Sequence, residues 1–356
     1  MSDRRKEAEA KMAKSIFISG DGWLAVFDLL QPSQLGLEIA TISHRFNFYV
    51  DEHFKTRKWT LKSFRIRSKI RKNGTKEMVY DWRPLAIPQK PLPKKIVGFK
   101  AISIEYIDNN AIAFLHRFRP LFAVCPINLA INIYYNDRIL DFFLQNIWPM
   151  LGKNIYAIEL SVRIFHRLRQ FVPSILNDCP SLRLVISCAG DFFTEFPADD
   201  NAMASDGQAV AKWLFTALPN NVPKVFKCEL GNDDGNLASD IEAIKAAFAL
   251  ASSPVNFIVV IPFWPSFGDP VVPFDQINEL TREQLALRRI ENTDHFLLVR
   301  CPIVRNASKW AKWEKEAIGW EIDDQWNQIN IQIYGEDEIG DGLLDTIPGS
   351  SDQQQK

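Results

Sequence analysis

The chain has 356 residues, of which 47% are hydrophobic and 12% aromatic, and its formal net charge is -1. This composition excludes a wholly disordered chain, and the length predicts two or three folded units. The near-zero net charge gives no overall attraction to nucleic acid or to an anionic membrane, so any electrostatic interpretation must be local.

The N-terminal residues, the lengths of the apolar runs and the cysteines indicate the cellular compartment. Residues 1–14 are charged throughout and lack the apolar core of a signal peptide, and no apolar run reaches the ~20 residues of a membrane span. The five cysteines form no C-x-x-C pair, which is typical of reduced thiols. We therefore expect a soluble cytoplasmic or nuclear protein with no membrane partner, and a flexible lead-in over residues 1–14.

Residues 15–59 contain three short helical patterns. Ser19, Ser33 and Ser43 stand before them as possible N-caps, and Pro32 closes the first. A bundle this small cannot hide all of its large apolar side chains, so some should face a partner. The apolar positions at helical spacing are Trp23, Val26, Phe27 and Leu30, then Leu35, Ile39 and Ile42, then Phe46, Val50 and Phe54.

This stretch resembles an F-box. Ile18-Ser19 stands where Leu-Pro is usual, Pro32 and Leu35 match the break after the first helix, and the run Ser43–Phe46 stands where a Cys-Lys-Arg-Trp-like run is typical. Ser19 in place of proline is a departure. The chain as a whole resembles the expanded F-box-containing family of plant-parasitic nematodes, through the segments HFKTRKW (53–59), LRQFVPSILNDCPSLR (168–183), LLVRCPIVR (297–305) and KWAKWEKEAIGW (309–320).

The resemblance implies a receptor subunit of an SCF-type ubiquitin ligase. The bundle would bind a Skp-type adaptor, and through it a cullin, while the region beyond residue 95 would present an unknown protein target. This chain would perform no covalent step. The alternative is an ordinary three-helix subdomain. The residues expected to contact the adaptor are Ile18, Trp23, Phe27, Leu30, Pro32, Leu35 and Ile39.

Residues 60–94 predict a basic hairpin followed by a Pro-rich connector. Apolar and basic residues alternate from Phe64 to Arg71, and Asn73-Gly74 is a hairpin signal before Met78 and Tyr80. A basic strand face of this kind binds phosphate on nucleic acid or on a modified partner, or else it is a solvated edge strand. The candidate phosphate-binding residues are Arg65, Arg67, Lys69, Arg71 and Lys72.

Residues 95–264 alternate strand and helix patterns. Strand-like runs near Phe99, Asn128, Ile155 and Leu182 recur about every 27 residues, a period typical of a leucine-rich-repeat-like solenoid. The run CPSLRLV (179–185) resembles the repeat junction of F-box proteins with such repeats. A doubly wound α/β sheet is the alternative. The predicted helices are 111–121, 139–151, 164–176, 208–217 and 237–250, and two further strands are predicted at 224–230 and 254–263.

Residues 265–334 predict a β-rich C-terminal region with a Trp-rich helix. Segments 285–290 and 296–301 predict a hairpin, 309–320 a helix, and 326–334 a final strand. The tryptophans of the helix either stack on a ligand or anchor the helix on a sheet. The acidic, Gln-rich residues 335–356 predict a disordered tail. The whole chain is therefore expected to be α+β, with an F-box-like bundle ahead of a repeat-like α/β region.

Catalytic motifs are missing from the sequence. It contains no phosphate-cradling glycine loop and no G-x-S-x-G turn, and its five histidines lie far apart. The acidic pairs Asp199-Asp200, Asp233-Asp234 and Asp323-Asp324 are typical of solvated loops. We therefore expect no enzyme activity, no cofactor and no metal. An enzyme on a doubly wound sheet, with its site at the strand ends, is the least supported alternative.

Overall fold

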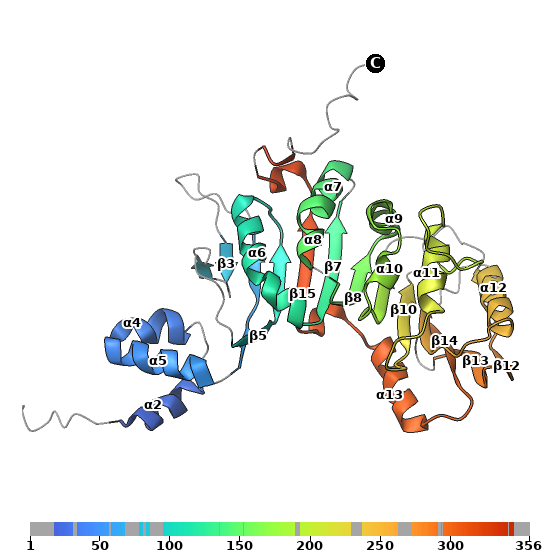
Figure 1. The fold of residues 1–356 in the computed structure, drawn as a ribbon, viewed down its shortest axis with the longest axis horizontal. Helices are drawn as coiled ribbons and strands as arrows, with labels where there is room; N and C mark the ends of the chain where they lie inside the picture. The colour runs from blue at the N-terminus through green and yellow to red at the C-terminus, as the bar shows by residue number, and fades with distance from the viewer. Residues whose placement is uncertain are drawn as a thin grey trace, which may run out of the picture. The chain divides into compact units, whose positions relative to one another are not determined.

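The chain is described by a computed structural model. It covers residues 18–30, 34–56, 58–67, 78–80, 83–85, 95–134, 136–151, 153–188, 193–228, 237–262, 272–290, 293, 295–340 and 342–344. Two compact units divide the chain: Met1–Leu61 with Pro93–Val97, and Lys62–Leu92 with Gly98–Lys356. Figure 1 labels many of their helices and strands. The expected lead-in over residues 1–14 lies outside the described residues.

The described residues of the small unit form three helical segments, as the pattern of residues 15–59 predicts. Ser19 caps the first, because its Oγ accepts a hydrogen bond from the Gly22 N–H at 3.2 Å. Ser43 does the same for the last segment, accepting from the Phe46 N–H at 3.3 Å. The elements are α2 (Gly20–Phe27), the π-helical η1 (Leu35–Ile39) continuing into α4 (Ala40–Ile42), α5 (His44–Thr56) and the strand β1 (Trp59–Leu61). Strand β1 pairs with β5 (Ile96–Phe99), of which Ile96 and Val97 belong to this unit.

The large unit is built on one mixed sheet. Among the described residues its 13 strands run in the order β12-β13-β14-β11-β10-β9-β8-β7-β15-β6-β2-β3-β4. The eight neighbouring strands β2, β6, β15, β7, β8, β9, β10 and β11 are parallel to one another. Antiparallel strands extend the sheet at both ends: β3 and β4 beyond β2, and β14, β13 and β12 beyond β11. Their bounds are β2 (Phe64–Ile66), β3 (Met78–Tyr80), β4 (Arg83–Leu85), β6 (Ala101–Ile104), β7 (Ile127–Ile133), β8 (Ile155–Leu160), β9 (Leu184–Ser187), β10 (Lys224–Cys228), β11 (Phe257–Pro262), β12 (Phe274–Asn278), β13 (Glu283–Arg289), β14 (His295–Pro302) and β15 (Gln328–Ile333).

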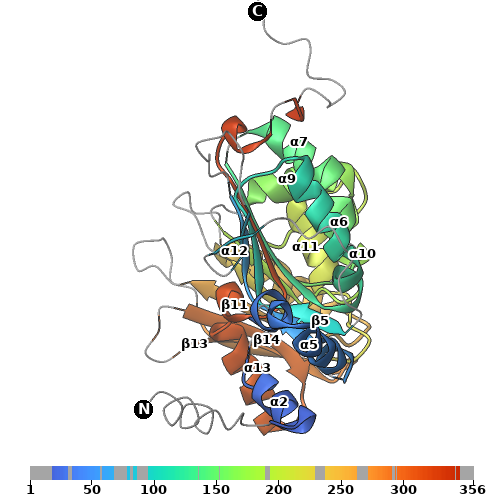
Figure 2. The ribbon, with the colours of Figure 1, turned by 90° about the vertical axis from the view of Figure 1, so that its left-hand side faces the viewer.

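Strands β7 to β11 follow one another in chain order without reversal. Because parallel crossovers are right-handed, a sheet that grows in one direction keeps its connecting helices on one face. Figure 2 shows α6, α7, α9, α10 and α11 on the same side. A doubly wound sheet would need a reversal, so that alternative does not describe these strands. The helices are α6 (Asn109–Val124), α7 (Asp137–Asn146), α8 (Trp148–Leu151), α9 (Val162–Phe171), α10 (Ile175–Asp178), α11 (Asp206–Leu214), α12 (Leu237–Ala249) and α13 (Ala307–Ile318).

The two faces of the sheet are covered differently: connecting helices cover one face, and α13 covers one end of the other. The face under α6 to α12 is apolar along its whole width; Ile102 and Leu129 near one end of the sheet and Phe226 of β10 are all 0% exposed. On the opposite face α13 packs against the end formed by β9, β10, β11 and β14, with Trp310 and Ala317 in a shared apolar cluster. Period-two alternation along each strand produces this separation.

Strand β15 lies inside the sheet, between β6 and β7. Ile329 is in register with Ile102 on one side and with Leu129 on the other. The sequence places this strand in a separate C-terminal β-rich region, 265–334, and that division is corrected here. Strands β12 to β14 extend the same sheet, and β12 was not predicted. Local periodicity identifies a strand but carries no information about a partner far away in sequence.

The beginning of the predicted disordered tail is packed. Residues Glu336–Glu338 form the 3-10 turn η3, and Ile339 forms a parallel bridge with Ile107. The Ile339 and Leu344 side chains are 4% and 9% exposed, respectively. Two apolar side chains in an otherwise acidic run therefore hold it on the sheet unit, which corrects the prediction for residues 335–340 and 342–344; residues 341 and 345–356 lie outside the described part.

Candidate binding surfaces

Among its described residues, the small helical unit has an apolar core of three side chains. Phe27, Leu35 and Val50 are 1%, 0% and 1% exposed, one from each helical segment. Partly buried aromatic residues surround them; Trp23 packs edge-on against Phe46, with ring centroids 4.7 Å apart and an interplanar angle of 81°. Offset and edge-on ring pairs of this kind stabilise small cores beyond their buried area.

The structure divides the seven predicted adaptor-binding residues. Phe27 and Leu35 belong to the core, so a partner cannot reach them in this conformation, and their assignment to the adaptor surface is corrected. Helical spacing shows which residues share a face, but the packing of the three segments decides whether that face points inward. Pro32 lies outside the described residues. The partly buried members are Ile18, Trp23, Leu30 and Ile39.

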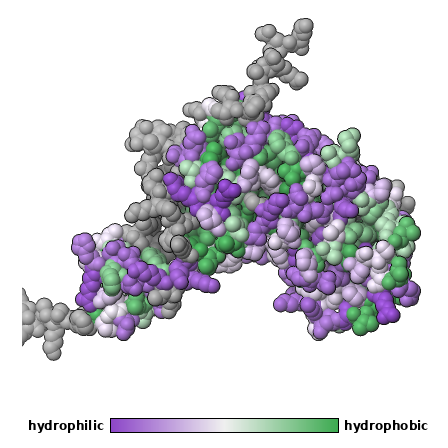
Figure 3. Space-filling view, viewed as in Figure 1, coloured by the Kyte–Doolittle hydropathy of each residue, from purple (hydrophilic) through white to green (hydrophobic). Residues whose placement is uncertain are grey.

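Other apolar side chains of this unit are exposed. Leu29, Ile42 and Phe48 are 85%, 63% and 59% exposed, and Val26 is 39% exposed. Figure 3 shows apolar and polar residues interspersed on the visible face of the unit. The sequence analysis did not predict Leu29 and Phe48 as contacts, because it considered only apolar residues at helical spacing and these two lie outside those patterns. The only available signal was the surplus of large apolar residues for so few helices.

Strands β2 and β3 pair antiparallel, as the predicted hairpin requires, but β2 is not at an edge of the sheet; the predicted turn Asn73-Gly74 lies outside the described residues. Phe64 pairs with Tyr80 in antiparallel register, while the other side of β2 pairs with β6. The solvated-edge-strand interpretation is therefore wrong for this strand. Arg65 Nε lies 3.0 Å from Glu105 Oε1, so its charge is partly balanced within the sheet. Arg67 is partly buried, and the remaining candidates Lys69, Arg71 and Lys72 lie outside the described residues.

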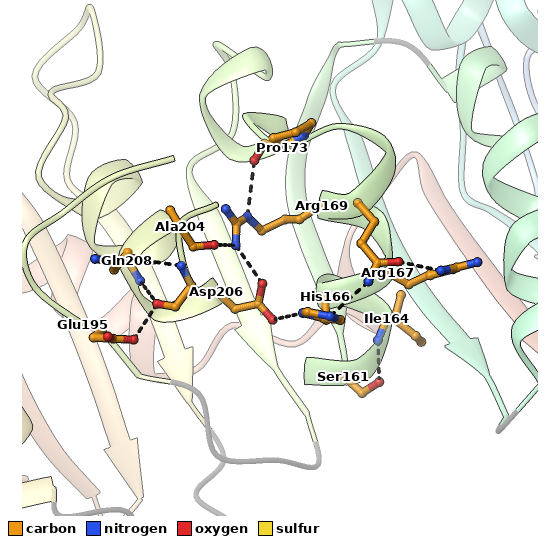
Figure 4. A network of polar contacts seen from close by, with 12 residues as sticks. Ser161, Ile164, His166, Arg167, Arg169, Pro173, Glu195, Ala204, Asp206 and Gln208 are labelled. Carbon is orange, nitrogen blue, oxygen red and sulfur yellow. Dashed lines mark hydrogen bonds and ion pairs between the residues drawn. The ribbon is translucent and has the colours of Figure 1, made fainter. Parts of the chain in front are cut away.

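Helix α9 carries a network of polar contacts, drawn in Figure 4. Arg169 is 6% exposed and donates to the Ala204 carbonyl at 2.8 Å and to Asp206 Oδ1 at 2.9 Å. His166 Nδ1 lies 3.1 Å from the second carboxylate oxygen of Asp206, and its Nε2 lies 3.1 Å from Gln170 Nε2. Although a His-Asp contact resembles part of a catalytic dyad, these contacts fasten α9 to the segment that begins α11, which is a structural role.

Trp310 and Trp313 of α13, with Trp320 just beyond the helix end, anchor this helix on the sheet. Trp310 is 4% exposed, and Trp313 and Trp320 are partly buried against the same cluster, which confirms anchoring rather than ligand stacking for these three. Trp326, which lies outside the helix, is 53% exposed, with Lys100 Nζ 5.9 Å from its ring centroid.

Several buried groups have shifted pKa values. Burial lowers the pKa of Lys224 to about 7; its Nζ donates to the Trp213 carbonyl and lies 5.0 Å from the indole centroid. Burial also raises the pKa of Cys179 and that of Cys301 to about 11. These groups are isolated from one another in the core and form no constellation for acid-base chemistry.

Of the acidic pairs, Asp199-Asp200 has hydrogen-bond partners of its own. Asp200 accepts from Asn177 Nδ2 at 2.7 Å, and Asp199 accepts from the Asn201 N–H at 3.1 Å. Asp323 and Asp324 are exposed in the short turn η2 (Ile322–Asp324), and Asp233-Asp234 lies outside the described residues. The described residues contain no group of three or more His, Cys, Asp and Glu side chains suited to holding a metal ion.

No helix in the described part of the chain combines the length and apolar character needed to cross a membrane. Comparison with protein-family models, with curated proteins and with solved structures finds no match for this chain. The functional interpretation therefore rests on the residues themselves and on the surfaces described above.

Proposed function

We propose that this chain is the substrate-recognition subunit of an SCF-type ubiquitin ligase, in which a Skp-type adaptor binds the helical unit and the sheet unit presents a protein target. The F-box resemblance of residues 15–59 motivates the proposal. The observation that carries it is a separate helical unit whose small core leaves Leu29, Ile42 and Phe48 exposed.

Burial of these side chains on a partner supplies the binding energy. A leucine, isoleucine or phenylalanine side chain gains about 1.5 to 3 kcal/mol when it moves fully from water into an apolar contact. The helical unit cannot provide that contact for side chains that lie outside its core. An apolar groove on an adaptor would supply it.

The order of the strands in the sheet unit supports the proposal of a repeat-like region that binds the target. Strands β7, β8, β9, β10 and β11 lie in chain order with their helices on one face, as expected for stacked strand-helix repeats. Strand β15, helix α13 and the antiparallel ends depart from a plain leucine-rich-repeat solenoid. The region expected to read the target is thus a repeat-like core with additions at both ends.

In this proposal the chain acts by proximity. It holds a target near the conjugating enzyme and raises the effective concentration of the reacting groups, without a catalytic residue, cofactor or metal of its own. The proposed location is the cytoplasm or nucleus, where such ligases work.

Titration calorimetry of the full chain with a Skp-type adaptor tests the proposal. We expect wild-type binding and at least about tenfold weaker binding by the double variant Leu29→Ala plus Ile42→Ala, because interface anchors cost ~1 to 3 kcal/mol each on truncation. The matched control is Leu250→Ala plus Leu280→Ala. These side chains are 85% and 76% exposed in the other unit and should leave the affinity unchanged.

Two outcomes contradict the proposal. A wild type that is folded by circular dichroism but does not bind the adaptor would make the helical unit merely structural. Equal losses in the test and control variants would show that binding does not depend on the helical unit.

A further inference from the structure

The sheet face opposite the connecting helices carries amide and hydroxyl side chains across β6, β15 and β7. Asn330 lies in register between Ser103 of β6 and Ala130 of β7. One step along the alternation, Gln332 lies in register with Asn132. These side chains share a face by alternation, and Ser103, Asn132, Asn330 and Gln332 are all partly exposed.

Two tyrosines complete this surface at the carboxyl ends of β7 and β15. Tyr134 continues the ladder, because its N–H donates to the Ile333 carbonyl at 2.9 Å. Alternation places Tyr134 on the side of Asn132 and Tyr334 on the side of Gln332. They are 60% and 59% exposed, while Ile133 and Ile333, on the opposite face, are 4% and 0% exposed. Two large rings therefore lie accessible on neighbouring strands.

The middle of this surface is uncharged. On its β2 side Arg65 is paired with Glu105 at 3.0 Å, and on its β8 side lies Glu159. Farther along the sheet, Lys227 Nζ donates to the Trp320 carbonyl at 2.8 Å, beneath the end of α13. A nucleic acid needs cationic groups for its phosphates, and the central strands β6, β15 and β7 offer none on this face.

We propose that the amide-tyrosine face, defined as Ser103, Asn132, Asn330, Gln332, Tyr134 and Tyr334, binds an extended, uncharged polypeptide segment of the target; this inference rests on the proposed receptor function. The carboxamides of Asn132 and Gln332 both donate and accept hydrogen bonds, so they complement the alternating N–H and C=O groups of an extended main chain, whereas the Asn330 Oδ1 atom is buried. Tyrosine rings supply large contact areas with a polar end, and tyrosine is enriched in protein interfaces for this reason.

The insertion of β15 creates this face. Asn330 and Gln332 come from β15 and Tyr334 follows it directly, whereas Ser103 and Asn132 come from β6 and β7 and Tyr134 follows β7 directly. With β15 in place, six polar side chains lie side by side on three adjacent strands. Because all three strands are internal in the sheet, their backbone positions are fixed and the surface is pre-organised for binding.

Selection of a displayed library of random peptides of about 12 residues on the full chain tests the inference. Peptides recovered are titrated by fluorescence anisotropy against the wild type and against Tyr134→Ala plus Tyr334→Ala. We expect at least about tenfold weaker binding by the double variant, since removal of an anchoring ring commonly costs that much. Gln332→Met should also weaken binding, because it removes a donor and an acceptor while keeping similar volume.

The matched control is Val124→Ala plus Phe171→Ala. These side chains are 70% and 43% exposed on helices α6 and α9, which cover the other face, so peptide affinity should not change. Circular dichroism checks that all variants are folded.

Three outcomes would overturn the inference: a library that yields no peptide, peptides that bind the tyrosine variant as well as the wild type, or a panel of neutral oligosaccharides that binds through the tyrosines while peptides do not. Calorimetry with the adaptor separates this result from the proposed function. The tyrosine variant should bind the adaptor like the wild type, and adaptor binding should fail only if the proposed function fails.

Discussion

Glu283 and Arg300 form a buried ion pair between neighbouring strands β13 and β14. Arg300 Nη2 and Nε lie 2.6 Å and 3.1 Å from Glu283 Oε2, and the two side chains are 1% and 0% exposed. Glu283 Oε1 also accepts from the Val255 N–H at 2.8 Å. The guanidinium lies 5.3 Å and 5.2 Å from the ring centroids of Phe215 and Phe248. The pair therefore ties the antiparallel end of the sheet to the segment just before β11, which contains Ser253 and Val255, and to the ends of α11 and α12.

Arg300→Met should strongly destabilise the sheet unit. The change leaves the buried Glu283 carboxylate without its cation, which typically costs about 3 to 5 kcal/mol of unfolding free energy. Urea denaturation followed by circular dichroism measures the loss. Arg163→Met is the control, because its pair with Asp137 is partly exposed (34% and 71% for the two side chains) and should be worth less than about 1 kcal/mol. A similar loss of unfolding free energy in both variants would contradict the conclusion that the Glu283–Arg300 pair is buried and stabilising.

The stability of the sheet unit should rise with pH because of Lys224. Its folded pKa of about 7 lies below the ordinary value of 10.5, so between these values the unfolded chain binds the extra proton. Between about pH 7 and pH 10.5, this group should therefore raise the unfolding free energy by up to about 1.4 kcal/mol per pH unit. Below about pH 7 the amine is protonated in both states, so its effect on the unfolding free energy no longer changes with pH.

Lys224→Met isolates that contribution, because the other titrating groups are common to both proteins. Urea denaturation at about pH 7.5 and at about pH 9.5 should show a difference between wild type and variant that shifts in favour of the wild type as pH rises. Parallel pH profiles would show that the amine is not held neutral in the fold.

The stability of the helical unit should respond differently to substitution of a core leucine and of a surface leucine. Leu35→Ala removes a side chain that is 0% exposed and should cost about 2 to 5 kcal/mol, whereas Leu29→Ala should change stability by no more than about 0.5 kcal/mol. Hydrogen exchange of the backbone amides of α5 reports the stability of this unit separately. Equal protection in the two variants would show that Leu35 is not part of the core.

Thiol reactivity should single out Cys188. It is partly exposed, whereas the other four cysteines are buried, and burial raises the pKa values of Cys179 and Cys301 to about 11. Native protein treated with a thiol reagent near pH 8 should therefore be labelled first at Cys188, and the remaining thiols should react after unfolding. Mass spectrometry identifies the site, and Cys188→Ser should remove the fast phase. A persistent fast phase in that variant would refute the prediction.

Strand and helix positions in the sheet unit were accessible from local pattern. The run Ile155–Leu160 was predicted as a strand and forms β8, and the apolar spacing of residues 309–320 predicted the anchored helix α13. Both signals arise from the side-chain period of the element itself, which is set by neighbours a few residues away. Ser19 shows the same locality, since a serine where the F-box pattern has proline still caps its helix.

The candidate surfaces were only partly accessible from the sequence. It established a helical unit with surplus apolar side chains and a basic strand, because those properties depend on residue type and spacing. The tertiary structure decided that Leu35 is internal and Leu29 exposed, and that β15 lies between β6 and β7 beside Asn132 and Ser103. These outcomes depend on packing and strand pairing between residues far apart in the chain, about which local periodicity carries no information.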